Sequence, residues 1–260
     1  MSLADDFDGF LVDLDGVVWV GREPVPGSPE TLAALLAAGK RIAFVTNNPG
    51  RHPATYAERL RSLGVPVEEA QIVTAGMVVA RMAAAAADGG GAFVIGARSL
   101  HEMVAAAGAP LLEGEEARGA RVVVVSGHRG FDYEELLTAK LALDGGAALV
   151  ATSHDPTMPM PGGEWPGTGA VLAAVETASG RTAEIAGKPE RHLFEMALEA
   201  IGHPPRVAMI GDRVSSDVAG GRAAGLATVL VLSGTSDRAE AAAAEPRPDH
   251  VLENLAGLLT

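Results

Sequence analysis

The chain has 260 residues, of which 48% are hydrophobic, and it carries a formal net charge of −13 at pH 7. This length allows one large domain or two smaller ones with a substantial core. The acidic charge argues against a nucleic-acid partner, because binding a phosphate backbone requires clustered Lys and Arg. Cysteine is absent, which excludes disulfides and thiolate metal sites.

The sequence lacks the pattern of a secreted or membrane protein. Asp5, Asp6 and Asp8 lie where a signal peptide would be basic and then apolar. The longest apolar stretch, around Val78 to Ala87, is interrupted by Arg81 and is too short to cross a bilayer. We therefore expect a soluble, cytoplasmic protein with no membrane partner.

Short β-branched runs alternate with alanine- and leucine-rich stretches along the whole chain. Strands are expected at Gly9–Leu14, Arg41–Thr46, Ala92–Gly96, Arg121–Ser126, Ala147–Thr152, Thr182–Ala186, Arg206–Ile210, Ala227–Leu232 and His250–Leu252. Helices are expected at Pro29–Ala38, Ala54–Leu63, Ser99–Ala107, Tyr133–Leu143, Ala170–Ala178, Glu190–Ala200, Asp217–Ala224 and Asp237–Ala244. This alternation predicts an α/β fold with βαβ units, parallel sheets and right-handed crossovers.

Two glycine-containing segments indicate domain boundaries. The Asp88–Gly91 stretch is the most linker-like, and Ser179–Arg181 is a second break. They predict an inserted domain over residues 83–182 and a core made from residues 1–82 and 183–260.

Asp13 and Asp15 follow an apolar run that begins at Phe10 and precede Gly16. Ligands of open α/β sheets bind at the carboxyl ends of the strands. The pair therefore suits a nucleophile and a separate general acid with a divalent cation between them. Two solvated aspartates at a strand end are an equally good explanation of this pair alone.

Two further polar groups follow predicted strands. Thr46, Asn47 and Asn48 offer hydroxyl, amide and backbone donors for a phosphoryl group, although an ordinary turn explains this segment better when it is taken alone. Lys188 would direct its ammonium toward the same edge of the sheet, to neutralise a phosphate or a carboxylate. A merely solvated lysine is the alternative.

Asp212 and Asp217 belong to a fourth segment, in which an apolar strand ends in Gly-Asp before a helix. Unit charges of like sign ~4 Å apart repel by about 4 kcal/mol at an effective dielectric constant of ~20. A hard divalent cation removes that penalty, and ligands that are all oxygen fit Mg²⁺. Asp217 could equally be a helix N-cap.

Taken together, these segments resemble the haloacid dehalogenase-like (HAD-like) hydrolase superfamily, and more narrowly its NagD and p-nitrophenyl phosphatase branch. The resemblance covers nearly the whole chain. It rests on Asp13-x-Asp15-Gly16-Val17-Val18-Trp19 with Pro26-Gly27, Thr46-Asn47-Asn48, Pro166-Gly167-Thr168-Gly169-Ala170, Gly187-Lys188-Pro189 with His192-Leu193-Phe194, and Gly211-Asp212-Arg213.

The resemblance implies a Rossmann-like parallel-sheet core with an inserted α/β cap, and a Mg²⁺-dependent phosphatase of small phosphate monoesters. Asp13 would attack phosphorus to form an aspartyl-phosphate, and Asp15 would act as the general acid and base. The metal would be held by Asp13, Asp15 through its backbone carbonyl, and Asp212, with support from Asp217. The phosphoryl oxygens would be bound by Thr46, the Asn47–Asn48 segment and Lys188.

The substrate is less well indicated. The family commonly has Thr-Asn-x-Asp in the cap where this chain has Thr152-Ser153-His154-Asp155, and His128 also departs from the usual aspartate. His154, Asp155 and Arg213 are our candidates for contacting the substrate. Nucleoside monophosphates, phosphoglycolate, glycerol phosphate, pyridoxal phosphate and sugar phosphates all remain open, with p-nitrophenyl phosphate as a laboratory substrate.

Two other functions fit the same residues. A receiver-like signalling or phosphate-binding protein also combines aspartates, Thr or Ser and Lys around Mg²⁺, but such domains are shorter, lack a cap and have no acid corresponding to Asp15. A phosphotransferase would replace water with an acceptor alcohol. The resemblance also allows a homodimer formed through the cap.

Overall fold

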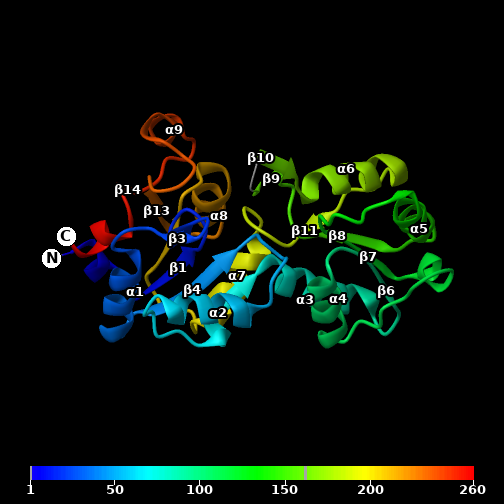
Figure 1. Cartoon of the computed structure of the whole chain (residues 1–260), viewed down its shortest axis with the longest axis horizontal. Helices are drawn as coiled ribbons and strands as arrows, with labels where there is room; N and C mark the ends of the chain where they lie inside the picture. The colour runs from blue at the N-terminus through cyan, green and yellow to red at the C-terminus, as the bar shows by residue number, and fades with distance from the viewer. Residues whose placement is uncertain (1, 161–162) are drawn as a thin grey trace. The chain divides into compact units, whose positions relative to one another are not determined.

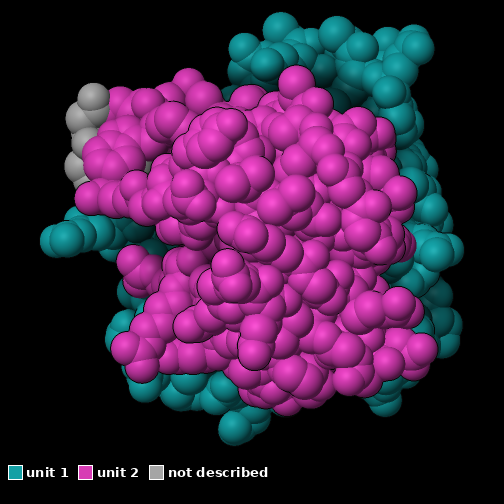
Figure 2. Space-filling view, turned by 90° about the vertical axis from the view of Figure 1, so that its right-hand side faces the viewer, with its two compact units in different colours: residues 1–46, 52–73, 188–260 teal, residues 47–51, 74–187 magenta. Residues whose placement is uncertain are grey.

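The computed structural model describes residues 2–160 and 163–260, which form two compact units (Figures 1 and 2). Unit 1 contains residues 1–46, 52–73 and 188–260, and unit 2 contains residues 47–51 and 74–187. Each unit is built around its own sheet. Among the described residues, no helix is long and apolar enough to span a bilayer.

Unit 1 is organised around a six-stranded sheet in the order β14-β13-β12-β1-β4-β5, in which β14 through β4 pair in parallel. Its strands are β1 (Gly9–Asp13), β4 (Arg41–Thr46), β5 (Ile72–Thr74), β12 (Val207–Gly211), β13 (Ala227–Val231) and β14 (His250–Leu252). Its helices are α1 (Ser28–Ala37), α2 (Pro53–Ser62), α7 (Arg191–Ala200), α8 (Ala219–Ala223) and α9 (Arg238–Ala243). A short hairpin of β2 (Trp19–Val20) and β3 (Glu23–Pro24) follows β1.

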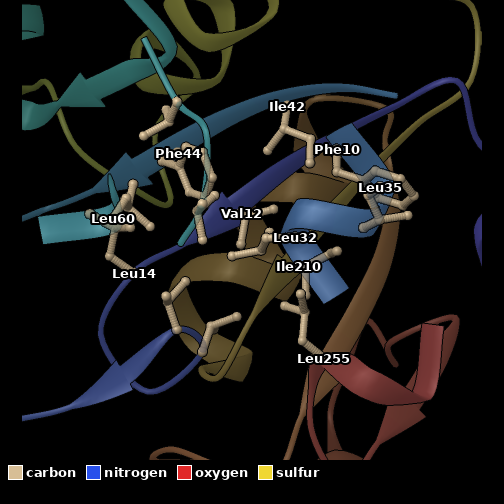
Figure 3. Close-up of a cluster of buried hydrophobic side chains, with 14 of the residues drawn as sticks. Phe10, Val12, Leu14, Leu32, Leu35, Ile42, Phe44, Leu60, Ile210 and Leu255 are labelled. Carbon is tan, nitrogen blue, oxygen red and sulfur yellow. The ribbon is translucent and has the colours of Figure 1, made fainter. Parts of the chain in front are cut away.

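The central strands of unit 1 are covered on both faces. Every residue of β1 is buried, which is why this segment is continuously apolar rather than alternating. Figure 3 shows the core on one face, where Phe10, Val12 and Phe44 of the strands share a buried cluster with Leu32 and Leu35 of α1 and Leu60 of α2. Helix α7 packs near β1 and β4 and buries Leu193 and Phe194. This packing holds the carboxyl ends of the central strands in place.

Unit 2 has a four-stranded parallel sheet in the order β11-β8-β7-β6. Its strands are β6 (Ala92–Ile95), β7 (Val122–Val125), β8 (Ala148–Ala151) and β11 (Glu184–Ile185), and its helices are α3 (Ala75–Ala87), α4 (Arg98–Ala106), α5 (Tyr133–Asp144) and α6 (Thr168–Ser179). In Figure 1, α3 and α4 lie on one side of this sheet and α5 and α6 on the other. An antiparallel hairpin of β9 (Thr157–Met160) and β10 (Gly163–Pro166) precedes α6.

The predicted α/β fold with parallel sheets is confirmed. The division into units differs from the one predicted, since it falls after residues 73 and 187 rather than after 82 and 182. Helix α3 packs against α4, β7 and β8, and β11 pairs with β8, so both segments belong to unit 2. The glycines after Asp88 make a turn inside that unit. Helix α3, strand β5 and both hairpins had no predicted counterpart.

Candidate active site

The carboxyl edge of the unit 1 sheet gathers three acids and one lysine. Asp13 is the last residue of β1, and Asp212 directly follows β12, the strand paired with β1. Asp217 lies in a π-helical turn, Val214–Val218, that follows β12. Lys188 follows β11 and is the first residue of the last stretch of unit 1.

These side chains form a buried ionic cluster. Lys188 Nζ lies 2.7 Å from Asp13 Oδ1 and 2.7 Å from Asp217 Oδ1, and the three side chains are at most 10% exposed. Carboxylate oxygens of Asp13, Asp212 and Asp217 all lie within 4.8 Å of one another. Lys188 therefore balances only part of the negative charge of the three carboxylates.

Burial and mutual repulsion act on the acids of this cluster. Burial raises the pKa of Asp13 well above its usual value, Lys188 opposes the rise, and Asp217 and Asp212 add to it. Burial and the Asp217 charge likewise raise the pKa of Asp212. Burial would lower the pKa of Lys188, but Asp13 and Asp217 outweigh it and raise that pKa. The ammonium thus stays charged beside carboxyl groups that are costly to ionise together.

The donor set fits a hard divalent cation. Asp212 Oδ1 is buried and has no hydrogen-bond partner among the described residues, whereas Asp212 Oδ2 accepts the Thr235 backbone N–H at 2.7 Å. A buried carboxylate oxygen without a partner is costly. A cation shared by Asp13, Asp212 and Asp217 would satisfy this oxygen and relieve the repulsion, and such oxygen ligands suit Mg²⁺.

A loop that the sequence did not single out supports this cluster. Residues Ser233–Ser236 follow β13, and the Ser236 backbone N–H donates to the Asp212 carbonyl oxygen at 2.9 Å. The Ser233 hydroxyl donates to the Gly16 carbonyl oxygen at 2.7 Å. The loop therefore ties Asp212 to the turn that follows Asp13. The Ser-Gly-Thr-Ser sequence was the only signal, and it reads as an ordinary turn.

Gly234 leaves the space that Asp212 occupies, because a Cβ at this position would overlap the Asp212 carboxylate. We expect Gly234→Ala to lower the free energy of unfolding by about 1–3 kcal/mol, since Asp212 or the loop must shift. Denaturant unfolding measures this loss. Gly119→Ala is the matched control, because a Cβ there has no heavy atom within 4 Å. Equal stabilities of the two variants would contradict the crowding.

Asp217 is not the N-cap of a following helix. Its Oδ2 accepts the backbone N–H of Arg213 at 3.0 Å, four residues earlier in the chain, and its Oδ1 accepts from Lys188. An N-cap would instead accept from an N–H two or three residues later. The N-cap alternative is therefore wrong, and Asp217 links the π-helical turn to the lysine.

Asp15 and Thr46 differ in their exposure to solvent. The Asp15 residue is exposed, its Oδ1 accepts the Trp19 Nε1–H at 2.9 Å, and its carboxylate is not part of the three-acid cluster. Thr46 is 2% exposed and ends β4, directly after the residue paired with Asp13. The Asp15 carboxylate is thus held by an indole N–H, and Thr46 lies one residue beyond the residue that pairs with Asp13.

Four candidate site residues belong to unit 2, namely Asn47, Asn48, His154 and Asp155. Asn47 Nδ2 donates to Asp155 Oδ2 at 3.4 Å, and Asn48 Oδ1 accepts the Gly50 backbone N–H at 2.9 Å. His154 is exposed. The Asn48 side chain therefore stabilises its own turn, and the Asn47 side chain contacts another candidate residue.

Arg213 lies in unit 1 and His128 lies in unit 2, and each is described by its surroundings in its own unit. Arg213 is exposed, and its backbone N–H serves Asp217. His128 Nδ1 accepts the Gly130 N–H, and His128 Nε2 lies 2.9 Å from Glu135 Oε2. Both ring nitrogens of His128 are thus engaged within unit 2, as expected for a structural histidine.

Comparisons with known proteins identify relatives over most of the chain. Mouse chronophin is 38% identical over 268 aligned residues, covering 96% of this chain and 91% of its own. The structure of a glycerol phosphate phosphatase from Mycobacterium tuberculosis in complex with magnesium superimposes with a TM-score of 0.91 at 33% identity, covering 100% of this chain and 78% of that one. A p-nitrophenyl phosphatase from Archaeoglobus fulgidus has a TM-score of 0.89 at 32% identity, covering 97% and 98%.

Residues 10–110 match the family described as haloacid dehalogenase-like hydrolase, and residues 185–258 match a second HAD-hydrolase-like family. The two matched segments contain all four charged groups of the buried cluster, which are Asp13, Lys188, Asp212 and Asp217. The chain therefore belongs to the haloacid dehalogenase-like hydrolase superfamily.

Proposed function

We propose that the protein is a Mg²⁺-dependent phosphatase that hydrolyses small phosphate monoesters through a phosphorylated Asp13. The observation that carries this proposal is the buried Asp13 carboxylate, paired with Lys188 beside Asp212 and Asp217. A carboxylate fixed at a strand end, next to a cation and a candidate metal site, suits nucleophilic attack on phosphorus.

The proposed reaction has two steps. An Asp13 carboxylate oxygen bonds to phosphorus as the ester P–O bond breaks, and Asp15 gives its proton to the departing oxygen. Water then attacks the phosphorus of the aspartyl-phosphate and gives a proton back to Asp15, which releases phosphate and restores Asp13. Lys188, Thr46 and the backbone of Asn47 bind the phosphoryl oxygens throughout.

The metal would be held by Asp13, Asp212 and the Asp15 backbone carbonyl, with Asp217 supporting them. When bound there, Mg²⁺ supplies positive charge that offsets the carboxylates and the phosphoryl oxygens. The unpartnered Asp212 Oδ1 supports this assignment.

Unit 1 is the proposed catalytic core, and unit 2 is the proposed cap that selects the substrate. Relatives of this chain are named for glycerol phosphate and p-nitrophenyl phosphate, so these are the first substrates to test. His154, Asp155 and Arg213 remain the proposed specificity residues. We further propose a cytoplasmic location, and a homodimer formed through the cap remains to be tested by measuring the mass in solution.

Hydrolysis of p-nitrophenyl phosphate with and without EDTA tests the proposed function. We expect turnover to require Mg²⁺ and to stop on chelation, because the acid cluster repels an anionic substrate in the absence of a cation. Mg²⁺ should also raise the melting temperature of the wild type and leave that of Asp212→Asn unchanged. Full activity in EDTA would refute the proposal.

A further inference from the structure

Trp19 makes a specific contact with Asp15 that the proposed reaction does not yet use. The indole is fully buried in the unit 1 core, and its Nε1–H reaches out to Asp15 Oδ1 at 2.9 Å. Trp19 is therefore a core residue that presents one polar atom to an exposed carboxylate. A buried indole N–H usually finds an acceptor, and here the acceptor is the proposed general acid.

The backbone between the two residues folds Trp19 back toward Asp15. Gly16 has a φ of +85°, a conformation that favours glycine, and its N–H donates to the Trp19 carbonyl oxygen at 2.7 Å. The Trp19 N–H returns to the Leu14 carbonyl oxygen at 3.3 Å. The turn thus sets the direction from which the indole meets the carboxylate.

Arg59 of α2 holds the indole in place. Its guanidinium carbon lies 3.9 Å from the centroid of the Trp19 ring, and its Nη2 donates to the Gly21 carbonyl oxygen at 2.7 Å. A guanidinium stacked on an aromatic face is attracted to the ring. The ring is packed in the core and carries Arg59 on one face, so its N–H has little freedom to turn away from Asp15.

We propose that Trp19, held by Arg59, is a positioning residue that fixes the Asp15 carboxylate for proton transfer to the leaving group. The indole engages Oδ1 and leaves Oδ2 to carry the proton. This inference rests on the proposed function, in which Asp15 is the general acid. Without the indole, an exposed aspartate would sample other rotamers and present the proton less often in the required direction.

Substrates with different leaving groups distinguish a positioning role of Trp19 from a purely structural one. An alkoxide leaves only with a proton, so glycerol 3-phosphate needs a well-placed acid, whereas p-nitrophenolate is stable and leaves without one. The ratio kcat/KM reports the steps up to departure of the leaving group. A misplaced Asp15 should therefore lower kcat/KM for glycerol 3-phosphate and spare it for p-nitrophenyl phosphate.

The test compares both substrates in Trp19→Phe, which keeps a buried aromatic ring and removes the N–H. We expect kcat/KM for glycerol 3-phosphate to fall about tenfold, a part of the ~10²–10⁴ that general acid catalysis contributes, with less than about a twofold change for p-nitrophenyl phosphate. Arg59→Met, on the half-buried helix α2, should show a smaller change in the same direction. Leu32→Val, a core truncation in α1, controls for lost stability. It should change kcat/KM by the same factor on both substrates.

A second readout needs no activity. The chain has only two tryptophans, Trp19 and Trp165, so an amide NMR spectrum contains two indole N–H signals, and Trp19→Phe assigns them. Asp15→Ala should move the Trp19 signal and leave the Trp165 signal in place. An unmoved Trp19 signal would overturn the contact.

Equal losses on the two substrates in Trp19→Phe would overturn the positioning role and leave Trp19 as a packing residue. The variant Asp15→Asn tests whether Asp15 is the general acid at all. If this variant loses the same factor on both substrates, the acid role of Asp15 is wrong, and the positioning role falls with it. If Asp15→Asn loses far more kcat/KM on glycerol 3-phosphate than on p-nitrophenyl phosphate and Trp19→Phe does not, only the positioning role is wrong.

Discussion

Asp13→Asn is expected to lose at least about 10⁴ in kcat for p-nitrophenyl phosphate while remaining folded, because the amide cannot attack phosphorus. The fold should survive, since Asn removes the repulsion of Asp13 with Asp212 and Asp217 as well as its attraction to Lys188. Steady-state turnover and circular dichroism measure the two effects. Asp8→Asn is the matched control, because Asp8 precedes the same strand and pairs with Arg206 away from the acid cluster. It should keep wild-type turnover.

Phosphate trapping distinguishes the proposed phosphatase from a receiver-like protein. With p-nitrophenyl phosphate, Asp15→Asn should accumulate acid-resistant, alkali-labile phosphate on the protein, because the first step proceeds and the second lacks its base. Asp13→Asn should accumulate none. Stable phosphate on the wild type would favour a receiver-like function, and full turnover by Asp13→Asn would refute the nucleophile.

Lys188→Met is expected to cost about 3–5 kcal/mol of folding free energy, because it leaves Asp13 and Asp217 buried without their cation. Turnover should also fall by about 10²–10³, since the ammonium that binds the phosphoryl oxygens is lost. Chemical denaturation in the absence of metal gives the stability, and p-nitrophenyl phosphate hydrolysis gives the activity.

The double variant Lys188→Met/Asp217→Asn separates the two effects. Removing one carboxylate together with the ammonium leaves the net charge of the cluster unchanged, so most of the lost stability should return. Activity should not return, because the phosphoryl oxygens still lack the lysine. If Lys188→Met alone were as stable as the wild type, Lys188 would not stabilise the buried acids.

Much of the candidate site could be predicted because its residues end parallel strands. The apolar runs before Asp13, Thr46 and Asp212 predict buried strands, and the βαβ rule places their carboxyl ends on one edge. The structure brings Asp13 and Asp212 together on paired strands in this way. Lys188 also joins them, although the strand before it, β11, pairs with β8 in the unit 2 sheet and not in this one.

The division of the chain into units was decided by tertiary packing. Helix α3 is apolar enough to cover either sheet, and local composition cannot say which one it meets. Its contacts with β7 and β8 assign it to unit 2, and the pairing of β11 with β8 does the same for that two-residue strand. Glycines mark a turn of the chain, and a turn occurs within domains as well as between them.

The finer contacts of the site also depend on distant segments of the chain. Ser233 and Thr235 reach Gly16 and Asp212 across more than twenty residues of sequence, and only the folded sheet brings them together. Residue type and strand order were enough to place Asp13 and Asp212 side by side, because strand ends are set by local apolar patterns. Hydrogen bonds between loops depend on the path of the whole chain, so the partners of Asp212 and Asp15 emerged only in the folded protein.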